Sequence, residues 1–224
     1  MMLRHNSRIS LFLKASLIDH EKMSSCPISQ KWALFFKNLQ KKFGFILDII
    51  PVILDKPSQS YNELNCSRYL PVVRYRDAND TDIIADSDEQ IEKLIKNFDI
   101  REYFIETQEF QLATGNLLRD FNHFLRHGRK FQFKTDLLNI EKFLSKINTK
   151  FIDGDETNYS DCTLGPKLHC IKILGDYLNE DFFNDTTPHT RRYLEELYKD
   201  DIFRQICPYD MDIITHYIEK KDRS

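Results

Sequence analysis

The sequence lacks any run of about 18 uncharged apolar residues, so it encodes no ordinary transmembrane helix. Glycine and proline are also scarce, six and seven in 224 residues, which excludes a collagen-like repeat. Positive charge is not in excess, because the formal net charge is −3, and this gives no electrostatic reason to expect nucleic acid as a partner. The chain does contain 17 Phe and 10 Tyr. Because these can form a hydrophobic core, we expect a folded globular chain.

The cysteines show no spacing typical of a metal site or a disulfide framework. There are five, an odd number, at wide intervals: Cys26, Cys66, Cys162, Cys170 and Cys207. Neither zinc nor secreted disulfides fit them, and no metal is predicted. The apolar stretch near the N-terminus is too short for a signal peptide core, and no lipidation motif is present. We therefore expect a cytoplasmic chain in which each cysteine is by default a buried small hydrophobe.

The first hundred residues mix strand and helix signals. Strands are expected at 9–15, 45–54, 71–75 and 81–84, and helices at 28–42 and 87–98. The second strand is nearly continuous in apolar residues, which is typical of burial on both faces. A parallel pair joined by a helix, then a hairpin and a helix, gives a four-stranded mixed sheet. This is the thioredoxin-like arrangement.

Strand signals stop after about residue 100. One long helix is expected from Phe104 to His127, with others around 137–147 and at 158–178, 191–198 and 210–218. Asn158 and Asp161 have the spacing of a capping box, and the acidic run from Asp153 to Asp161 is otherwise typical of a solvent-facing loop. The sequence thus predicts an α+β thioredoxin-like domain at 1–100 and an all-α domain at 101–224.

Cys26 is the candidate catalytic residue. Cys26-Pro27-Ile28-Ser29 lies between the first expected strand and the first expected helix. A thiolate there faces free backbone N–H groups and the positive end of the helix dipole, and both favour the charged form. Because Ser29 stands where a C-x-x-C motif has its second cysteine, an outside thiol such as glutathione is needed to resolve a mixed disulfide.

Two further places are expected beside this thiol. In the thioredoxin fold a proline opening the third strand is typically cis, and the backbone of its neighbour pairs with a bound peptide or glutathione; Leu70-Pro71 has this position. The alternative is an ordinary trans proline at a strand start. Ser87 and Asp88 begin the next helix, where the γ-glutamyl end of glutathione docks in glutathione-binding proteins of this fold. The alternative is a plain helix cap.

The motifs resemble one family closely. Its pattern is matched in order at 13–15, 21–22, 26–31, 151–156, 161–162, 166–169, 192–194 and 207–208. These segments resemble the chloride intracellular channel family, which has a glutathione S-transferase fold of the omega-like type and a Cys-Pro-Phe-Ser/Cys-Gln-Arg motif. Here Ile28 replaces the Phe and Lys31 the Arg, and both keep the chemical type. The resemblance covers nearly the whole chain.

The resemblance implies two forms. The first is a soluble, reduced monomer that binds glutathione and has weak glutathione-dependent thiol oxidoreductase activity. In it Cys26 carries the chemistry, and the glutathione site comprises Cys26, Pro27, Leu70, Pro71, Ser87 and Asp88. The second is a reversibly membrane-associated form that conducts anions, with lipid contacts from about Cys26 to Leu54. The family also permits a noncatalytic scaffold that binds cytoskeletal proteins.

Charged residues make it unfavourable for segment 26–54 to enter a bilayer. The segment 26–54 contains Lys31, Lys37, Lys41, Lys42 and Asp48. Each central charge costs about 2.5–3.5 kcal/mol on insertion scales. Any inserted form therefore needs compensating pairs or oligomers.

Cys66 is the candidate redox partner of Cys26. It lies five residues before Pro71, and the resemblance implies that a cysteine near this position forms a disulfide in one family member during a fold switch. We hypothesise that oxidation joins Cys26 to Cys66 and exposes apolar surface. The alternative is an unrelated loop cysteine. His169 and Cys170, by contrast, lack partners at metal spacing and are interpreted as packing residues.

Overall fold

A computed structural model describes residues 3, 5–66, 69–77, 81–104 and 106–222. The chain divides into two compact units, Met1–Phe104 and Ile105–Ser224. Each unit has its own core and is described by itself below.

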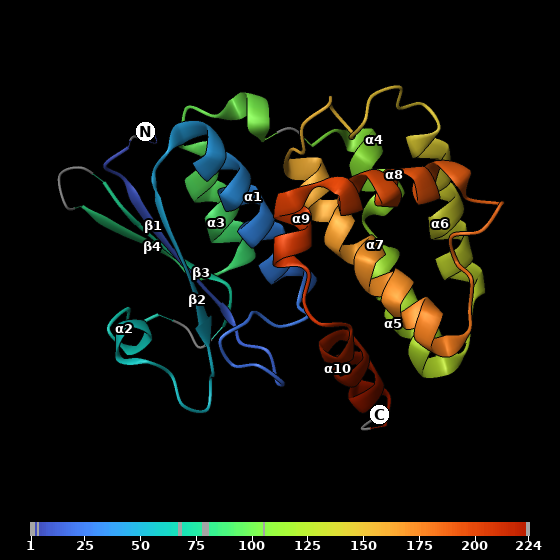
Figure 1. Cartoon of the computed structure of the whole chain (residues 1–224), viewed down its shortest axis with the longest axis horizontal. Coiled ribbons are helices and arrows are strands. Elements are labelled where there is room, and N and C mark those ends of the chain that lie inside the picture. The colour runs from blue at the N-terminus through green and yellow to red at the C-terminus, as the bar shows by residue number, and fades with distance from the viewer. Residues whose placement is uncertain (1–2, 4, 67–68, 78–80, 105, 223–224) are drawn as a thin grey trace. The chain divides into compact units, whose positions relative to one another are not determined.

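The first unit is built on a four-stranded mixed sheet (Figure 1). Its strands are β1 (Arg8–Lys14), β2 (Ile46–Val52), β3 (Val72–Arg76) and β4 (Asp82–Ala85), in the spatial order β2-β1-β3-β4. β1 runs parallel to β2 and antiparallel to β3, which in turn pairs antiparallel with β4. The mixed sheet predicted from the element order is confirmed.

The expectation that the second strand is buried on both faces is wrong. In β2 only Val52 is buried, Ile46 is exposed, and the strand between them is half-buried. The reason is its position, because β2 is an edge of the sheet rather than a central strand. Pro51 agrees with this, since a residue without a backbone N–H is tolerated mainly on edge strands.

Helix α1 (Pro27–Phe43) connects the two parallel strands. Its apolar stripe of Trp32, Phe35, Phe36 and Leu39 is almost wholly buried, as the three- and four-residue spacing predicts. Gly44 ends the helix with φ 67°, a left-handed backbone that glycine adopts without strain. The remaining helices of the unit are α3 (Asp88–Lys96), the short α2 (Gln59–Asn62) and a 3₁₀ turn (Arg101–Tyr103). No sequence pattern predicted α2, which has only four residues.

The second unit is all-helical. Its helices are α4 (Gln108–Thr114), α5 (Leu117–His127), α6 (Phe131–Leu144), α7 (Tyr159–Leu178), α8 (Pro188–Lys199), α9 (Asp201–Ile206) and α10 (Asp210–Asp222). The single helix expected from Phe104 to His127 is wrong. Thr107 caps a later start, where its hydroxyl accepts the Phe110 N–H at 3.1 Å, and Gly115 ends α4 before α5 begins.

The start of α7 is fixed by a buried capping box, as predicted. The Asn158 side chain accepts from the backbone of Asp161, and the Asp161 side chain accepts the Asn158 N–H at 3.0 Å. Asp161 is fully buried at the helix cap, whereas Asp153, Asp155 and Glu156 earlier in the acidic run are exposed, as expected for a solvent-facing loop. Its Oδ1 also accepts the Tyr193 hydroxyl at 2.7 Å and the Ile152 N–H at 3.1 Å, so a network of donors satisfies it.

Candidate functional site

The strand register brings the predicted site residues to one end of the sheet. Phe12 near the end of β1 pairs with Val72 at the start of β3, so Leu70-Pro71 lies where β1 ends. Ala85, the last residue of β4, pairs with Val73, which brings the start of α3 to the same end. Cys26 follows β1 through a short loop. The order and direction of the strands therefore bring these residues, which are far apart in sequence, to the same end of the sheet.

Cys26 is held at the first turn of α1 by the loop before it. The Ser24 N–H donates to the Lys14 carbonyl at 2.7 Å, and the Cys26 N–H reaches the Ser24 hydroxyl at 3.4 Å. Cys26 is the N-cap residue with Pro27 next to it, and its carbonyl accepts the Gln30 N–H at 3.0 Å. Its half-buried thiol does not cap the helix. The first-turn N–H groups can therefore face a thiolate or its adduct.

The two polar residues after this turn lie inside the protein. Ser29 and Gln30 are 0% exposed. Within the described residues neither the Ser29 hydroxyl nor the Gln30 amide has a hydrogen-bond partner. Ser29 was predicted as the residue in place of the second thiol, but no sequence pattern indicated the burial of Gln30.

The peptide bond between Leu70 and Pro71 is cis, as predicted, and the trans alternative is wrong. Leu70 packs against a core cluster of Phe12, Val52, Tyr61, Leu64 and Val72. The Tyr61 hydroxyl donates to the carbonyl of Tyr69 at 3.4 Å. Tyr69 and Leu70, directly before β3, are thus held by α2 and by this cluster.

Ser87 and Asp88 begin α3 and have separate tasks. The Ser87 hydroxyl accepts the Gln90 N–H at 3.2 Å, so the helix-cap interpretation of this residue is confirmed. Asp88 Oδ1 accepts the Trp32 indole N–H and the Lys31 ammonium, each at 2.6 Å. Asp88 therefore ties α3 to α1 within the structure itself.

The motif residue Lys31 has a buried contact that sequence reasoning missed. Its side chain is only 8% exposed, and besides Asp88 it meets Glu92 Oε1 at 3.6 Å. Its ammonium also lies 4.5 Å from the Trp32 ring centroid. A buried cation needs such partners because burial disfavours the charge. The sequence signal that could have indicated this burial is the position of Lys31 on the buried, largely aromatic face of the helix.

Cys66 lies at the same end of the sheet. It is half-buried, packs against the cluster that holds Leu70, and lines a hollow of about 180 Å³ with Tyr61 and Asn62. Both Cys66 and Cys26 are free thiols. Their pairing on oxidation stays a prediction.

The other three cysteines differ from these two. Cys162 and Cys170 are 0% exposed in α7, as the packing interpretation predicts. Burial, followed by the charge of Asp210, raises the pKa of the Cys207 thiol to about 12. Cys207 is therefore a thiol that resists ionisation. Within the described residues no group of His, Cys, Asp and Glu could hold a metal ion.

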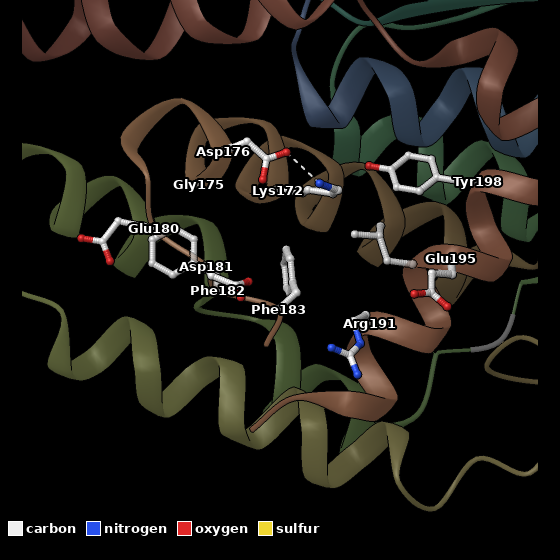
Figure 2. A pocket seen from close by; sticks show the side chains of 11 residues that line it. Lys172, Gly175, Asp176, Glu180, Asp181, Phe182, Phe183, Arg191, Glu195 and Tyr198 are labelled. Atoms are coloured by element: carbon white, nitrogen blue, oxygen red, sulfur yellow. Dashed lines mark hydrogen bonds and ion pairs between the residues drawn. The ribbon is translucent and has the colours of Figure 1, made fainter. Parts of the chain in front are cut away.

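A separate hollow of about 210 Å³ lies in the helical unit (Figure 2). Phe182 and Phe183 line it with Leu194, and charged side chains surround them. The Lys172 ammonium meets Asp176 Oδ2 at 2.7 Å on one side, as the dashed line in Figure 2 marks. None of the predicted site residues lines this hollow.

Comparison with curated proteins points in one direction. The protein named chloride intracellular channel exl-1 from Caenorhabditis elegans is 28% identical over 181 residues, which are 78% of this chain and 73% of that protein. The protein named chloride intracellular channel Clic from Drosophila melanogaster is 28% identical over 216 residues, 93% of this chain and 80% of that protein. Over most of its length this chain is similar to proteins named chloride intracellular channels. A scan of protein-family models found no match.

Solved structures show which fold the chain has. The crystal structure of the CLIC homologue EXC-4 from C. elegans superposes with a TM-score of 0.81 at 22% identity, over 97% of this chain and 83% of that one. The crystal structure of glutathione transferase Omega 1C from Trametes versicolor gives a TM-score of 0.67 at 11% identity, over 96% and 97%. The chain has the glutathione S-transferase fold.

Because the similar proteins are named channels, the presence or absence of a membrane-spanning helix is relevant. Among the residues that the structure describes, none of the helices combines the length and the apolar character needed to traverse a bilayer.

Proposed function

We propose that this chain is a glutathione-dependent monothiol oxidoreductase in which Cys26 is the catalytic residue. The observation that carries the proposal is the gathering of Cys26, cis-Pro71 and the start of α3 at one end of the sheet. Related structures that are glutathione transferases support glutathione as the small-molecule partner.

The reaction balances with two molecules of glutathione. The Cys26 thiolate attacks the glutathione sulfur of a mixed disulfide, forms a new S–S bond and releases the other thiol as a thiolate, which takes a proton. A second glutathione thiolate then attacks the Cys26-bound disulfide and leaves as oxidised glutathione, which regenerates the Cys26 thiolate. The first-turn N–H groups of α1 stabilise the negative sulfur at each stage.

Glutathione would lie along this end of the sheet. We propose that the backbone at Leu70-Pro71 pairs with its peptide part and that the start of α3, at Ser87 and Asp88, receives the γ-glutamyl end. Pro27 would lie beside the glutathione sulfur. Because one oxygen of Asp88 already accepts two donors, its main task is to hold α3 in place beside Lys31 and Trp32.

The test is the reduction by glutathione of a small mixed disulfide. Cys26→Ser is expected to remove the activity, because a hydroxyl does not form the intermediate disulfide. Cys207→Ser is the matched control, since burial and a raised thiol pKa exclude Cys207 from the reaction. Equal activity in wild type and Cys26→Ser would contradict the proposal and favour a noncatalytic scaffold, with cytoskeletal proteins among its candidate partners.

Reversible membrane association with anion conduction is the second candidate function, and the names of the two relatives favour it. If residues 26–54 enter a bilayer, the contacts of Lys31 and Trp32 with Asp88 must break first. Chloride release from lipid vesicles that still retain a larger trapped dye would support conduction. Release of both solutes together would indicate general leakage and contradict it.

A further inference from the structure

We propose that the hollow of about 210 Å³ in the helical unit is a binding site for a small protonated amine that carries an apolar group. Its lining comes from the last turns of α7, from the segment that follows α7 and from α8, and we call it the α7–α8 hollow (Figure 2). None of the residues predicted for the thiol chemistry lines it. The inference therefore goes beyond the proposed oxidoreductase and does not depend on it.

The segment that follows α7 forms a fixed wall of the hollow. The Glu180 N–H donates to the Gly175 carbonyl at 2.9 Å, and the Glu180 side chain forms an ion pair with Lys130 at the start of α6. The Phe182 ring packs on Phe133 with the ring centroids 5.0 Å apart. Because these contacts exist without a ligand, binding does not have to order the wall first, and less conformational entropy is lost.

Three buried apolar side chains line the hollow. They belong to Phe182, Phe183 and Leu194. Figure 2 shows the Phe183 ring standing between the segment after α7 and helix α8. The volume of about 210 Å³ equals that of about seven water molecules in the liquid, so a ring with a short side chain is a suitable size. An aromatic and aliphatic lining of this kind selects a ligand with an apolar body.

The two cations in the lining already have acidic partners. The Lys172 ammonium meets Asp176 Oδ2 at 2.7 Å, as the dashed line in Figure 2 marks. Arg191 Nη1 meets Asp185 Oδ1 at 3.3 Å. An anionic ligand would have to compete with one of these carboxylates for its cation. The hollow is therefore poorly suited to an anion.

Two carboxylates in the lining have no such partner. Asp181 and Glu195 are exposed, and among the residues that the structure describes neither side chain forms an ion pair or a hydrogen bond. The charge of Glu195 acts on Lys199, but that ammonium pairs with Glu196 at 2.7 Å. In Figure 2 Asp181 and Glu195 lie on opposite sides of the Phe183 ring. Negative charge thus remains beside an apolar cavity, where a cationic group is favoured.

A protonated amine attached to a small ring satisfies both parts of the hollow. Its apolar body would pack on Phe183 and Leu194, and its ammonium would lie at the edge near Asp181 and Glu195. A metal ion does not fit, because no group of His, Cys, Asp and Glu among the described residues could hold one. A metal ion would also leave the aromatic lining uncovered. The chemistry therefore favours an arylalkylamine.

The experiment is a titration of the isotope-labelled full chain, followed through its amide NMR signals at neutral pH. The probe is phenethylamine, and it is compared with neutral phenethyl alcohol, with anionic phenylacetate and with ethylamine, which has no ring. Phenethylamine is expected to bind with a dissociation constant of about a millimolar or below. The alcohol should bind about fivefold more weakly, and phenylacetate and ethylamine more weakly still. The signals that shift should belong to residues 180–183 and 191–195.

Two variants separate the charged part of the hollow from its apolar part. Asp181→Asn combined with Glu195→Gln should weaken phenethylamine about fivefold, to the level of the alcohol, and leave the alcohol unchanged. Phe183→Leu should weaken both ligands about threefold, because it removes the ring face and keeps the charge. Urea midpoints show whether the variants fold. If Phe183→Leu does not fold, the carboxylate variant still decides, since both of its residues are exposed.

A matched control removes the same types of charge elsewhere in the helical unit. Glu109→Gln combined with Asp201→Asn changes two carboxylates that are 58% and 78% exposed and do not line the hollow. This variant should bind phenethylamine like wild type. Cys26→Ser should do the same, which separates the amine site from the thiol chemistry.

Four results would overturn the inference. Phenethylamine could bind no more tightly than phenethyl alcohol or phenylacetate, or the carboxylate variant and its matched control could lose affinity equally. The shifted signals could belong to segments outside the hollow. Finally, loss of amine binding in Cys26→Ser would assign the ligand to the thiol site instead.

Discussion

His169 shows how strongly a single buried residue can couple stability to pH. It is 4% exposed on α7, and its Nδ1 lies 2.8 Å from the Tyr198 hydroxyl. Burial, and then the charge of Lys172, lowers the pKa of His169 to about 4. The folded protein thus holds a neutral imidazole at pH values where the unfolded chain binds a proton. The interpretation of His169 as a packing residue is confirmed.

The first prediction concerns this residue. Because the folded pKa is lowered, the unfolded chain binds more protons between about pH 6.5 and 4, and stability falls as the pH decreases through that range. The loss from His169 between pH 7 and 5 is about 2 kcal/mol. Urea unfolding of wild type and His169→Gln at both pH values should show that much less acid sensitivity in the variant.

The comparison between wild type and variant isolates His169 from opposing groups. Burial raises the pKa of Asp161 to about 6, and burial together with Asp120 raises that of Asp136 to about 6. Both carboxyl groups favour the folded state at low pH and lose that effect as the pH rises through 6. Their contribution cancels between the two proteins. An identical pH dependence in wild type and variant would contradict a buried, neutral His169.

At the scale of elements, the capping box of α7 gives a graded prediction. Asn158→Ala removes an N-cap side chain and should cost about 1 kcal/mol. Asp161→Ala should cost more, about 3 kcal/mol, because it also leaves the buried Tyr193 hydroxyl and the Ile152 N–H unpaired. Urea unfolding measures both. Equal losses, or a larger loss for Asn158→Ala, would show that the Asp161 network is not the main support.

The link between α1 and α3 gives a third prediction. Asp88→Asn removes the 2.6 Å ion pair of the buried Lys31 ammonium and should cost about 1.5 kcal/mol, less than a fully buried pair because the Asp88 side chain is 39% exposed. Glu92→Gln is the matched control, since its oxygen is 3.6 Å from the same ammonium and a smaller loss is expected. If Asp88 acts only as a ligand for glutathione, Asp88→Asn will weaken glutathione binding and leave the urea midpoint unchanged.

The elements show what patterns in the sequence could and could not predict. The buried stripe of α1 and the capping box of α7 depend on residues close in sequence, and both were predictable. The break between α4 and α5 was missed because Gly115 is tolerated within an apolar periodicity that continues on both sides. The edge position of β2 depends on the order of strands in space, which its own apolar run does not encode.

At the scale of the whole molecule, five cysteines should divide into reactivity classes. Cys26 and Cys66 are half-buried and should react first with iodoacetamide in the native protein. Cys207 should react slowly because its thiol pKa is raised to about 12, and Cys162 and Cys170, fully buried, only after unfolding. Peptide mass spectrometry with and without urea measures this order. Early labelling of Cys162 or Cys170 would contradict the packing of α7.

Oxidation tests a second property of the same thiols. Peroxide treatment followed by disulfide mapping should give the Cys26–Cys66 pair, since both residues lie at one end of the sheet. A Cys66→Ser variant should then give no intramolecular disulfide. If wild type shows no such pair after peroxide, Cys66 is an ordinary loop cysteine.

The candidate site could be predicted residue by residue, but not its internal contacts. Cys26, Leu70-Pro71 and Ser87 follow from their places at strand and helix boundaries, which local sequence marks. The contact of Lys31 with Asp88 joins residues 57 positions apart in sequence and depends on the packing of two helices. Such a contact leaves no local pattern. The same is true of the buried amide of Gln30, which has no hydrogen-bond partner among the residues that the structure describes.

The position of Pro51 in an edge strand has a consequence for crowded conditions. An open strand edge offers backbone donors and acceptors to any other chain and can begin intermolecular sheet growth. In β2 the missing N–H of Pro51 interrupts that row, and Asp48, paired with Arg8 at 3.4 Å, adds charge to it. Pro51 thus protects the open edge of the sheet from pairing with another chain, and its replacement by valine would favour aggregation.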